Sequence, residues 1–274
     1  MASIQLKIYS AALKTRTNVN VFLPTLLPDQ NGATKRKHDF TTYYETHKDF
    51  PVLYLLHGTF GDEGDWQRFT RIEDYARNHN LAVVMPYGEN SFYRDTDAGK
   101  DYETYITQEL PQVIQWMFPV SKKREDTFIG GLSMGGTGAV RLGLAHPEIY
   151  GYTIGLSAVT DPIENWIDKE EFTVWSHAFV NSEHGQGSAD DLYDLADKAM
   201  KSEKVRTKLY LAVGTGDFLY EGNCKYHEYL EKIGYEHVFS TGEGIHNFDF
   251  WDPQIRKAIH EWLPLQSAGR VAGL

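Results

Sequence analysis

The stretch TFIGGLSMGGTGAVRLGLA, residues 127–145, indicates the fold of this 274-residue chain. It begins with an apolar run, passes through Gly131-Leu132-Ser133-Met134-Gly135, and continues into small and apolar residues typical of a packed helix. The five central residues fit G-x-S-x-G, a pattern that also occurs by chance. Between a strand and a helix, however, it is typical of a nucleophile elbow, a strained turn that lifts a serine hydroxyl above a sheet. The alternative is a glycine-rich turn with a spectator serine.

Apolar runs on both sides of this stretch predict further strands. Runs that are apolar on both faces are typical of buried parallel strands covered by helices. They lie at residues 52–56, 81–85, 127–129, 152–156 and 209–213, with a shorter one at 237–239. Helical periodicity separates them, for example over 102–117, where Pro111 should kink or restart the helix. Residues 4–9 and 19–23 alternate instead, which predicts an antiparallel pair at one sheet edge. The sequence therefore predicts an α/β fold with a mostly parallel central sheet and helices on both faces.

One segment interrupts this alternation. The segment 161–201 is long and acidic, and it contains several aromatic residues, among them Trp166 and Trp175. Long segments inside a compact domain usually serve function or contain helices of their own. We expect a single domain over 1–274 with a lid-like insertion at about 161–201, lying over the edge of the sheet where ligands bind. A polar stretch at 28–49 is expected to be an exposed loop.

Composition excludes several classes of function. The net charge of −11 disfavours a nucleic acid or an anionic membrane as partner, since both require clustered Lys and Arg. A single cysteine, Cys224, excludes an internal disulfide and a Cys/His metal cluster of the usual spacing, so we expect no metal. No run approaches the 18 or so apolar residues of a membrane helix, and residues 1–13 lack the apolar core of a secretory leader. We therefore expect a cytoplasmic protein.

A serine nucleophile needs a base, and the base needs a carboxylate that orients it. In a sheet of this kind the chain order is Ser, then Asp or Glu, then His, each on a loop after a later strand. Asp217 ends a tight turn after the run 209–213, and His246 ends a glycine-containing loop after the last strand. We take these two as the partners of Ser133. Other acids and histidines fit the order or the strand ends less well: Asp161, His177, His184, His237 and His260.

The same chemistry requires donors for an oxyanion. One is expected to be the amide of Met134, directly after the serine. The second should come from the loop after strand 52–56, with the Thr59 amide as first choice and the Phe60 amide as second. His57 in this loop is interpreted as bonding loop backbone. Aromatic residues on strand-end loops and in the insertion are candidates for substrate binding, with core packing as the alternative: Phe60, Trp66, Phe92, Tyr93, Trp166 and Trp175.

With these motifs in place, the chain resembles the esterase D or putative esterase family of α/β-hydrolases, most closely its tributyrin-esterase branch. The resemblance extends from about Pro51 to Trp262 and rests on several short motifs in order. They are residues 55–58, 85–86 with 90–93, 109–111, 118–121, 131–136, 214–220, and His246 with 251–252.

The resemblance implies a triad of Ser133, Asp217 and His246, no cofactor, and a small-molecule ester with a short-chain acyl or hydroxycinnamoyl (feruloyl-type) group as substrate. It also implies association into homo-oligomers. Three alternatives remain: an S-formylglutathione hydrolase, an acyltransferase that uses an alcohol in place of water, and a non-catalytic binding protein of the same fold.

Overall fold

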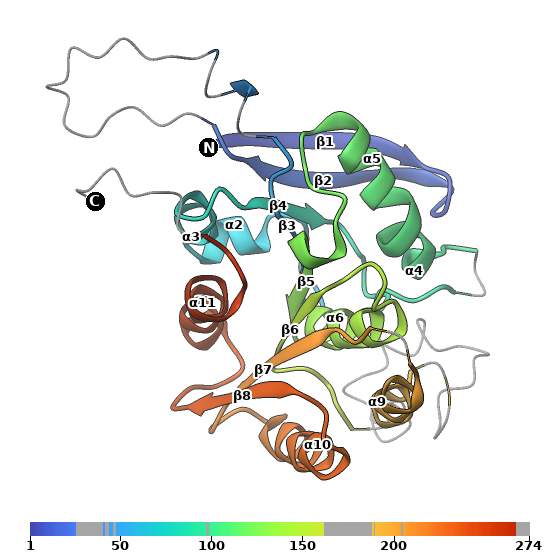
Figure 1. The fold of residues 1–274 in the computed structure, drawn as a ribbon, viewed down its shortest axis with the longest axis vertical. Helices are drawn as coiled ribbons and strands as arrows, with labels where there is room; N and C mark the ends of the chain where they lie inside the picture. The colour runs from blue at the N-terminus through green and yellow to red at the C-terminus, as the bar shows by residue number, and fades with distance from the viewer. Residues whose placement is uncertain are drawn as a thin grey trace, which may run out of the picture.

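The computed structural model describes residues 1–25, 41, 44–45, 48–96, 99–161, 188, 190–203 and 205–266. These residues contain an eight-stranded sheet with the order β1-β2-β4-β3-β5-β6-β7-β8 (Figure 1). The β1–β2 and β2–β4 pairs are antiparallel, and all other neighbours are parallel. The predicted α/β-hydrolase architecture, with its antiparallel N-terminal strands, is confirmed. The strands are β1 (Ala2–Ser10), β2 (Thr15–Leu23), β3 (Val52–Leu56), β4 (Ala82–Pro86), β5 (Thr127–Leu132), β6 (Tyr152–Leu156), β7 (Lys208–Gly214) and β8 (His237–Gly242).

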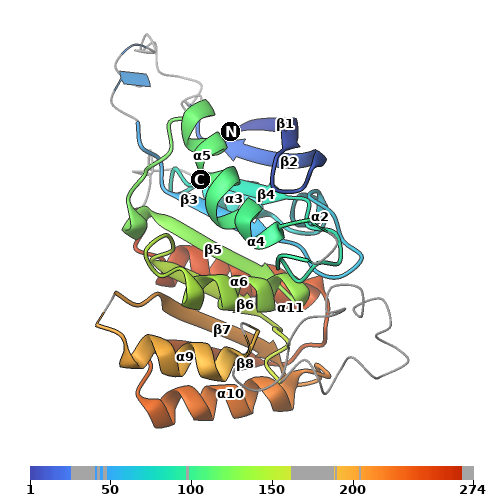
Figure 2. The same cartoon turned by 90° about the vertical axis from the view of Figure 1, so that its right-hand side faces the viewer.

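Helices cover both faces of this sheet (Figures 1 and 2). On one face lie α4 (Tyr102–Thr104), α5 (Leu110–Met117), α6 (Met134–Ala145), α9 (Leu192–Lys201) and α10 (Tyr220–Ile233). On the other lie α2 (Asp65–Phe69), α3 (Ile72–Arg77) and α11 (Phe248–Lys257), which continues as a π-helical turn over Ala258–Trp262. A 3-10 turn at Arg124–Asp126 precedes β5.

The apolar run of β3 shows why buried parallel strands lack alternation. Val52, Tyr54 and Leu56 pack into the core cluster that contains α5 and α6. Leu53 and Leu55 point to the opposite face and pack with α3 and α11. All five side chains are fully buried, because each face of the strand meets a helical layer.

The helix predicted over 102–117 is interrupted near Pro111, as expected. Between α4 and α5 the chain forms a π-helical turn, Tyr105–Glu109, in which the Leu110 N–H donates to Tyr105 O. Pro111 has no N–H to offer, so the carbonyl of Ile106 loses its helical partner. The hydroxyl of Tyr150 donates to that carbonyl at 2.9 Å.

The predicted insertion is described only at its ends. Residues 162–187 and 189, including Trp166 and Trp175, lie outside the described residues, as does most of the predicted loop 28–49. The C-terminal part of the segment is α9, whose N-terminus is capped by the Asp191 carboxylate. This helix packs against α6 and α10 in the layer over the sheet. Just before it, Asp190 pairs with Arg94 at 2.9 Å. Over the ranges that the structure describes, no helix has the length and apolar character needed to cross a membrane.

Candidate active site

Ser133 stands at a sharp turn between β5 and α6. Its backbone has φ 52° and ψ −122°, a strained conformation for a residue with a side chain. Its N–H donates to Leu156 O on the neighbouring strand at 2.8 Å, which holds the turn against the sheet. The serine is 7% exposed, so nearly all of its surface is covered by the surrounding protein.

Two glycines make this turn possible. A Cβ at Gly131 would lie 2.3 Å from Gly135 O, and a Cβ at Gly135 would lie 2.5 Å from His57 O. Real Cβ atoms do not approach backbone oxygens so closely, so any side chain would push β5, α6 and the loop after β3 apart. Both positions of the turn therefore require glycine.

The structure brings Ser133, His246 and Asp217 together. His246 Nε2 lies 2.9 Å from Ser133 Oγ, and His246 Nδ1 lies 2.9 Å from Asp217 Oδ2 and 3.1 Å from Oδ1. An ionised carboxylate only accepts hydrogen bonds, so Nδ1 carries the proton and Nε2 is free to accept from the serine hydroxyl. A general base adjacent to a serine needs this tautomer.

Backbone hydrogen bonds join the loops that carry Asp217 and His246. They follow the adjacent parallel strands β7 and β8, so both emerge at the same edge of the sheet. Thr215 N–H donates to Gly242 O and Gly216 N–H donates to Gly244 O, each at 2.9 Å. These two backbone bonds fix the separation of the carboxylate and the imidazole.

Asp217 is held as a carboxylate. Its side chain is fully buried, and burial by itself would raise its pKa. Hydrogen bonds from His246 and from the Leu219 N–H, the latter 2.9 Å long, outweigh burial and bring the pKa below its usual value. The group is therefore negatively charged at neutral pH and able to stabilise an imidazolium.

The loop after β3 approaches Ser133 from the other side. A turn closes it, with Gly61 N–H donating to Gly58 O at 3.2 Å and Phe60 at a positive φ of 64°. The Phe60 N–H is directed to Asn90 Oδ1 at 2.8 Å. Because this amide already has an acceptor, the Thr59 amide is the better candidate for an oxyanion donor.

His57 braces this loop, as its predicted structural role requires. Gly88 N–H donates to Nε2 at 2.9 Å, so Nδ1 holds the hydrogen and donates to Gly58 O at 2.7 Å. Burial lowers the pKa of His57, which keeps the ring neutral and preserves both bonds. The Tyr93 hydroxyl adds a third hydrogen bond by donating to His57 O at 3.0 Å.

The remaining predicted substrate-binding residues differ in position. Phe60 is 78% exposed at the site's rim. Trp66 lies in the core at 1% exposure, and its indole N–H donates to Leu56 O at 2.9 Å, so in this structure it presents no face to a substrate. Phe92 and Tyr93 are likewise buried, in agreement with the packing alternative. Trp166 and Trp175 lie outside the described residues.

Three residues near the triad carried no assigned role in the sequence: Asn90, Ser157 and Trp251. Asn90 and Trp251 fall within motifs of the family resemblance, which was the one available signal for them. Ser157 follows β6 without any local motif. Within the described ranges, no group of three or more His, Cys, Asp or Glu side chains is arranged to hold a metal.

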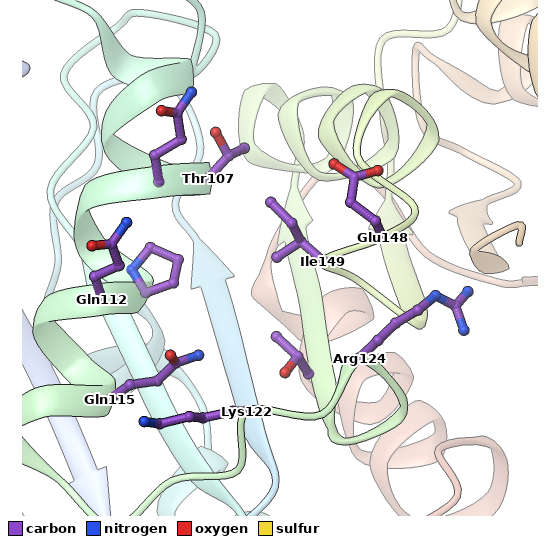
Figure 3. Close-up of a pocket in the computed structure, with 10 residues that line it drawn as sticks. Thr107, Gln112, Gln115, Lys122, Arg124, Glu148 and Ile149 are labelled. Atoms are coloured by element: carbon purple, nitrogen blue, oxygen red, sulfur yellow. The ribbon is translucent and has the colours of Figure 1, made fainter. Parts of the chain in front are cut away.

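A cavity of about 300 Å³ lies elsewhere, beside α5 (Figure 3). Gln112, Gln115 and Lys122 line one side of it, and Glu148 and Ile149 line the other. It also touches Thr127, the first residue of β5, whereas Ser133 follows the last. This cavity is at the opposite end of the strand from the triad.

Comparison with known proteins agrees with this geometry. Residues 10–262 match a family model described as putative esterase. An acetyl esterase of Caldicellulosiruptor saccharolyticus is 34% identical over 272 residues, 96% of this chain and 98% of that protein. The solved structure of FphF, a fluorophosphonate-binding serine hydrolase of Staphylococcus aureus, has a TM-score of 0.82 and 34% identity, covering 94% of this chain and 96% of that chain. An S-formylglutathione hydrolase (FrmB) of the same organism has a TM-score of 0.79 and 34% identity, covering 94% and 97%.

Proposed function

Since the chain belongs to the putative esterase family and is a serine hydrolase acting on ester bonds, we propose that it hydrolyses short-chain acyl or hydroxycinnamoyl (feruloyl-type) esters through an acyl-enzyme on Ser133. The observation that carries this proposal is the continuous chain of hydrogen bonds from Asp217 through His246 to Ser133, with 2.9 Å at each imidazole nitrogen. It gives the serine a base and gives the base a fixed tautomer.

The reaction has two halves. Ser133 Oγ bonds to the carbonyl carbon of the ester while its proton passes to His246 Nε2. The tetrahedral intermediate expels the alcohol, which takes that proton, and the acyl group remains on Oγ. Water then attacks the acyl carbon, giving a proton to Nε2, and the carboxylic acid leaves as that proton returns to Ser133. Asp217 stays ionised throughout and stabilises the imidazolium.

The amides of Met134 and Thr59 receive the oxyanion in this proposal. Met134 is the first residue of α6, where N–H groups have no partner within the helix. Thr59 and Phe60 are the two central residues of the turn closed by Gly58 and Gly61, and the Phe60 amide already donates to Asn90. The Thr59 hydroxyl is also buried and has no hydrogen-bond partner among the described residues. Both amides are fixed before the reaction, as oxyanion stabilisation requires.

Substrates of small, uncharged acyl groups suit the surroundings of the triad. Exposed apolar side chains flank it, including Phe60, Phe218 and Ile245. The similarity to an acetyl esterase supports a short acyl group as substrate of this chain, whereas the similarity to an S-formylglutathione hydrolase supports the thioester alternative. The aromatic residues of the segment after β6 motivate the hydroxycinnamoyl part of the proposal.

A substrate panel tests this assignment. Purified protein is assayed with p-nitrophenyl acetate, butyrate and octanoate, methyl ferulate, and S-formylglutathione, with Ser133→Ala as the blank. The proposal expects the highest kcat/KM on short acyl or feruloyl oxygen esters. A preference for S-formylglutathione of tenfold or more would assign the thioesterase reaction instead. Adding an alcohol and analysing the products distinguishes hydrolysis from acyl transfer to that alcohol.

In this proposal the enzyme needs no cofactor and acts in the cytoplasm. Copies of the chain associate into a homo-oligomer. The net charge of −11 favours a small-molecule substrate over nucleic acid. Sedimentation of the purified protein tests association, and fractionation of cells tests location.

A further inference from the structure

Two aromatic side chains contact the imidazole of His246, one from the core and one at the surface. Trp251, which is buried, packs against the imidazole with ring centroids 4.9 Å apart and planes at 87°. Phe218 packs against it with centroids 4.6 Å apart and planes at 46°. Because Phe218 is 59% exposed, much of its surface is accessible next to the general base.

Ile245 adds a second exposed apolar side chain beside the same imidazole. It directly precedes His246 in the chain and is 57% exposed. A Cβ at Gly216 would lie 3.1 Å from Ile245 Cγ2, so the isoleucine side chain lies over the loop that leads to Phe218. Phe218 and Ile245 therefore present apolar surface from the two loops that carry the carboxylate and the base.

The chemistry of the reaction determines which part of an ester lies beside His246. When the tetrahedral intermediate collapses, the bond from the carbonyl carbon to the alcohol oxygen breaks, and the proton on Nε2 moves to that oxygen. Such a transfer requires about 2.6–3.2 Å between the two heavy atoms. The alcohol oxygen therefore lies against the imidazole, while the carbonyl oxygen is directed to the amides of Met134 and Thr59. Because the Phe218 ring contacts this imidazole, the group attached to the alcohol oxygen begins within reach of that ring.

We infer that Phe218 and Ile245 form the binding site for the alcohol part of the ester, and that the enzyme prefers esters of aromatic alcohols to esters of small alkyl alcohols. This inference rests on the proposed function and adds the alcohol to it. A ring placed against Phe218 removes apolar surface of both groups from water and forms an aromatic pair. An ethyl group has too little apolar surface to gain as much.

A pair of acetates tests this inference, because every acetate forms the same acetyl-enzyme and differs only in its alcohol. Benzyl alcohol and ethanol have similar acidity, so a difference in kcat/KM between benzyl acetate and ethyl acetate reports the contact with the alcohol. We expect the native protein to favour benzyl acetate by about fivefold or more. Aromatic pairs change an equilibrium by about two- to tenfold, so Phe218→Ala should lower this preference by about three- to tenfold. Ile245→Ala should lower it by about twofold.

Two further variants serve as controls. Phe218→Tyr keeps the ring and should keep the preference. Trp116→Ala removes another exposed aromatic side chain, on α5, and should leave the preference unchanged. Trp116 follows Gln115, which lines the cavity at the opposite end of β5 from Ser133. If Phe218 served only to hold the imidazole in place, Phe218→Ala would slow both acetates by the same factor and the preference would stay.

The inference is overturned if the native protein favours benzyl acetate by less than about fivefold, or if Phe218→Ala keeps the preference within about twofold of the native value. It is also overturned if Trp116→Ala lowers the preference as much as Phe218→Ala does. A native protein that hydrolyses both acetates equally well loses this inference and keeps the proposed function. A native protein that hydrolyses no ester of the panel and takes no label at Ser133 overturns the proposed function, and the alcohol site with it.

Discussion

Asn90→Ala is expected to slow turnover without weakening substrate binding. Asn90 Oδ1 accepts the Phe60 N–H at 2.8 Å and so fixes the turn that contains Thr59, whose amide we propose as an oxyanion donor. A hydrogen bond between neutral groups contributes about 0.5–1.5 kcal/mol. Phe60 is 78% exposed, so water can replace Asn90 as the acceptor and the lower part of that range applies. At about 1.4 kcal/mol per factor of ten, kcat should fall about two- to fivefold. Complete loss of an oxyanion donor lowers kcat by about 10²–10³, but here the amide remains and is only less well fixed.

Steady-state kinetics on p-nitrophenyl acetate measures this effect, with Asn90→Asp as the control. Aspartate keeps an acceptor oxygen at the same place, so it should retain most of the native kcat. Melting curves of both variants exclude unfolding as the cause. The reasoning is refuted if Asn90→Ala keeps full kcat, if the loss is in KM, or if Asn90→Asp is as slow as Asn90→Ala.

Two further predictions concern stability. Gly135→Ala would place a Cβ 2.5 Å from His57 O and 2.6 Å from Leu56 O, so we expect a loss of about 1–3 kcal/mol in unfolding free energy together with most activity; a native melting temperature would contradict this. His146→Gln should reduce stability most between about pH 4.5 and 6.5. The hydrogen bond that the His146 ring N–H donates to the Glu103 carboxylate raises the pKa of His146, so the stabilisation by His146 is present below about pH 6.5 and is lost as the pH rises through the raised pKa. Burial would raise the pKa of Glu103, but its hydrogen bond with His146 and the charge of Arg141 outweigh burial and lower this pKa to about 2. The stabilisation by Glu103 is therefore present above about pH 4.5 and is lost as the pH falls toward 2. Both side chains are partly exposed, so we expect at most about 1 kcal/mol, measured by urea unfolding at pH 5.5 and pH 8.5; equal losses at the two values would contradict the assignment.

Much of the fold was predictable because its signals are local. Buried parallel strands such as β3 and β6 are short, continuous apolar runs, and the structure places them within the predicted bounds. The ends of β7 and β8 extend past the apolar runs, because the backbone bonds of the β7–β8 ladder continue where the sequence is no longer apolar. The π-helical turn before Pro111 was predicted only as a break. Its form depends on Tyr150, whose hydroxyl takes up the freed Ile106 carbonyl from a distant part of the sequence.

That Ser133, Asp217 and His246 lie together was predictable for a related reason. Chain order and strand ends select Ser133, Asp217 and His246, and the parallel sheet brings all three strand ends to one edge. Aromatic residues were harder to assign. Trp66 was predicted on a loop but lies in α2, and its sequence context fits a pocket and a core position equally well. Ser157 gave no signal at all. Its hydroxyl accepts the indole N–H of Trp251, which lies 94 residues later in the chain and meets it only in the folded protein.

The most direct measurement of the central claim is labelling with a fluorophosphonate, followed by mass spectrometry of the peptides. Reaction with such a probe requires a serine whose proton is removed by a neighbouring base. We expect one adduct, on Ser133, in the native protein, none in Ser133→Ala, and labelling at least about a hundredfold slower in His246→Gln. A folded native protein that takes no label, or one in which the label is on another serine, would contradict the account.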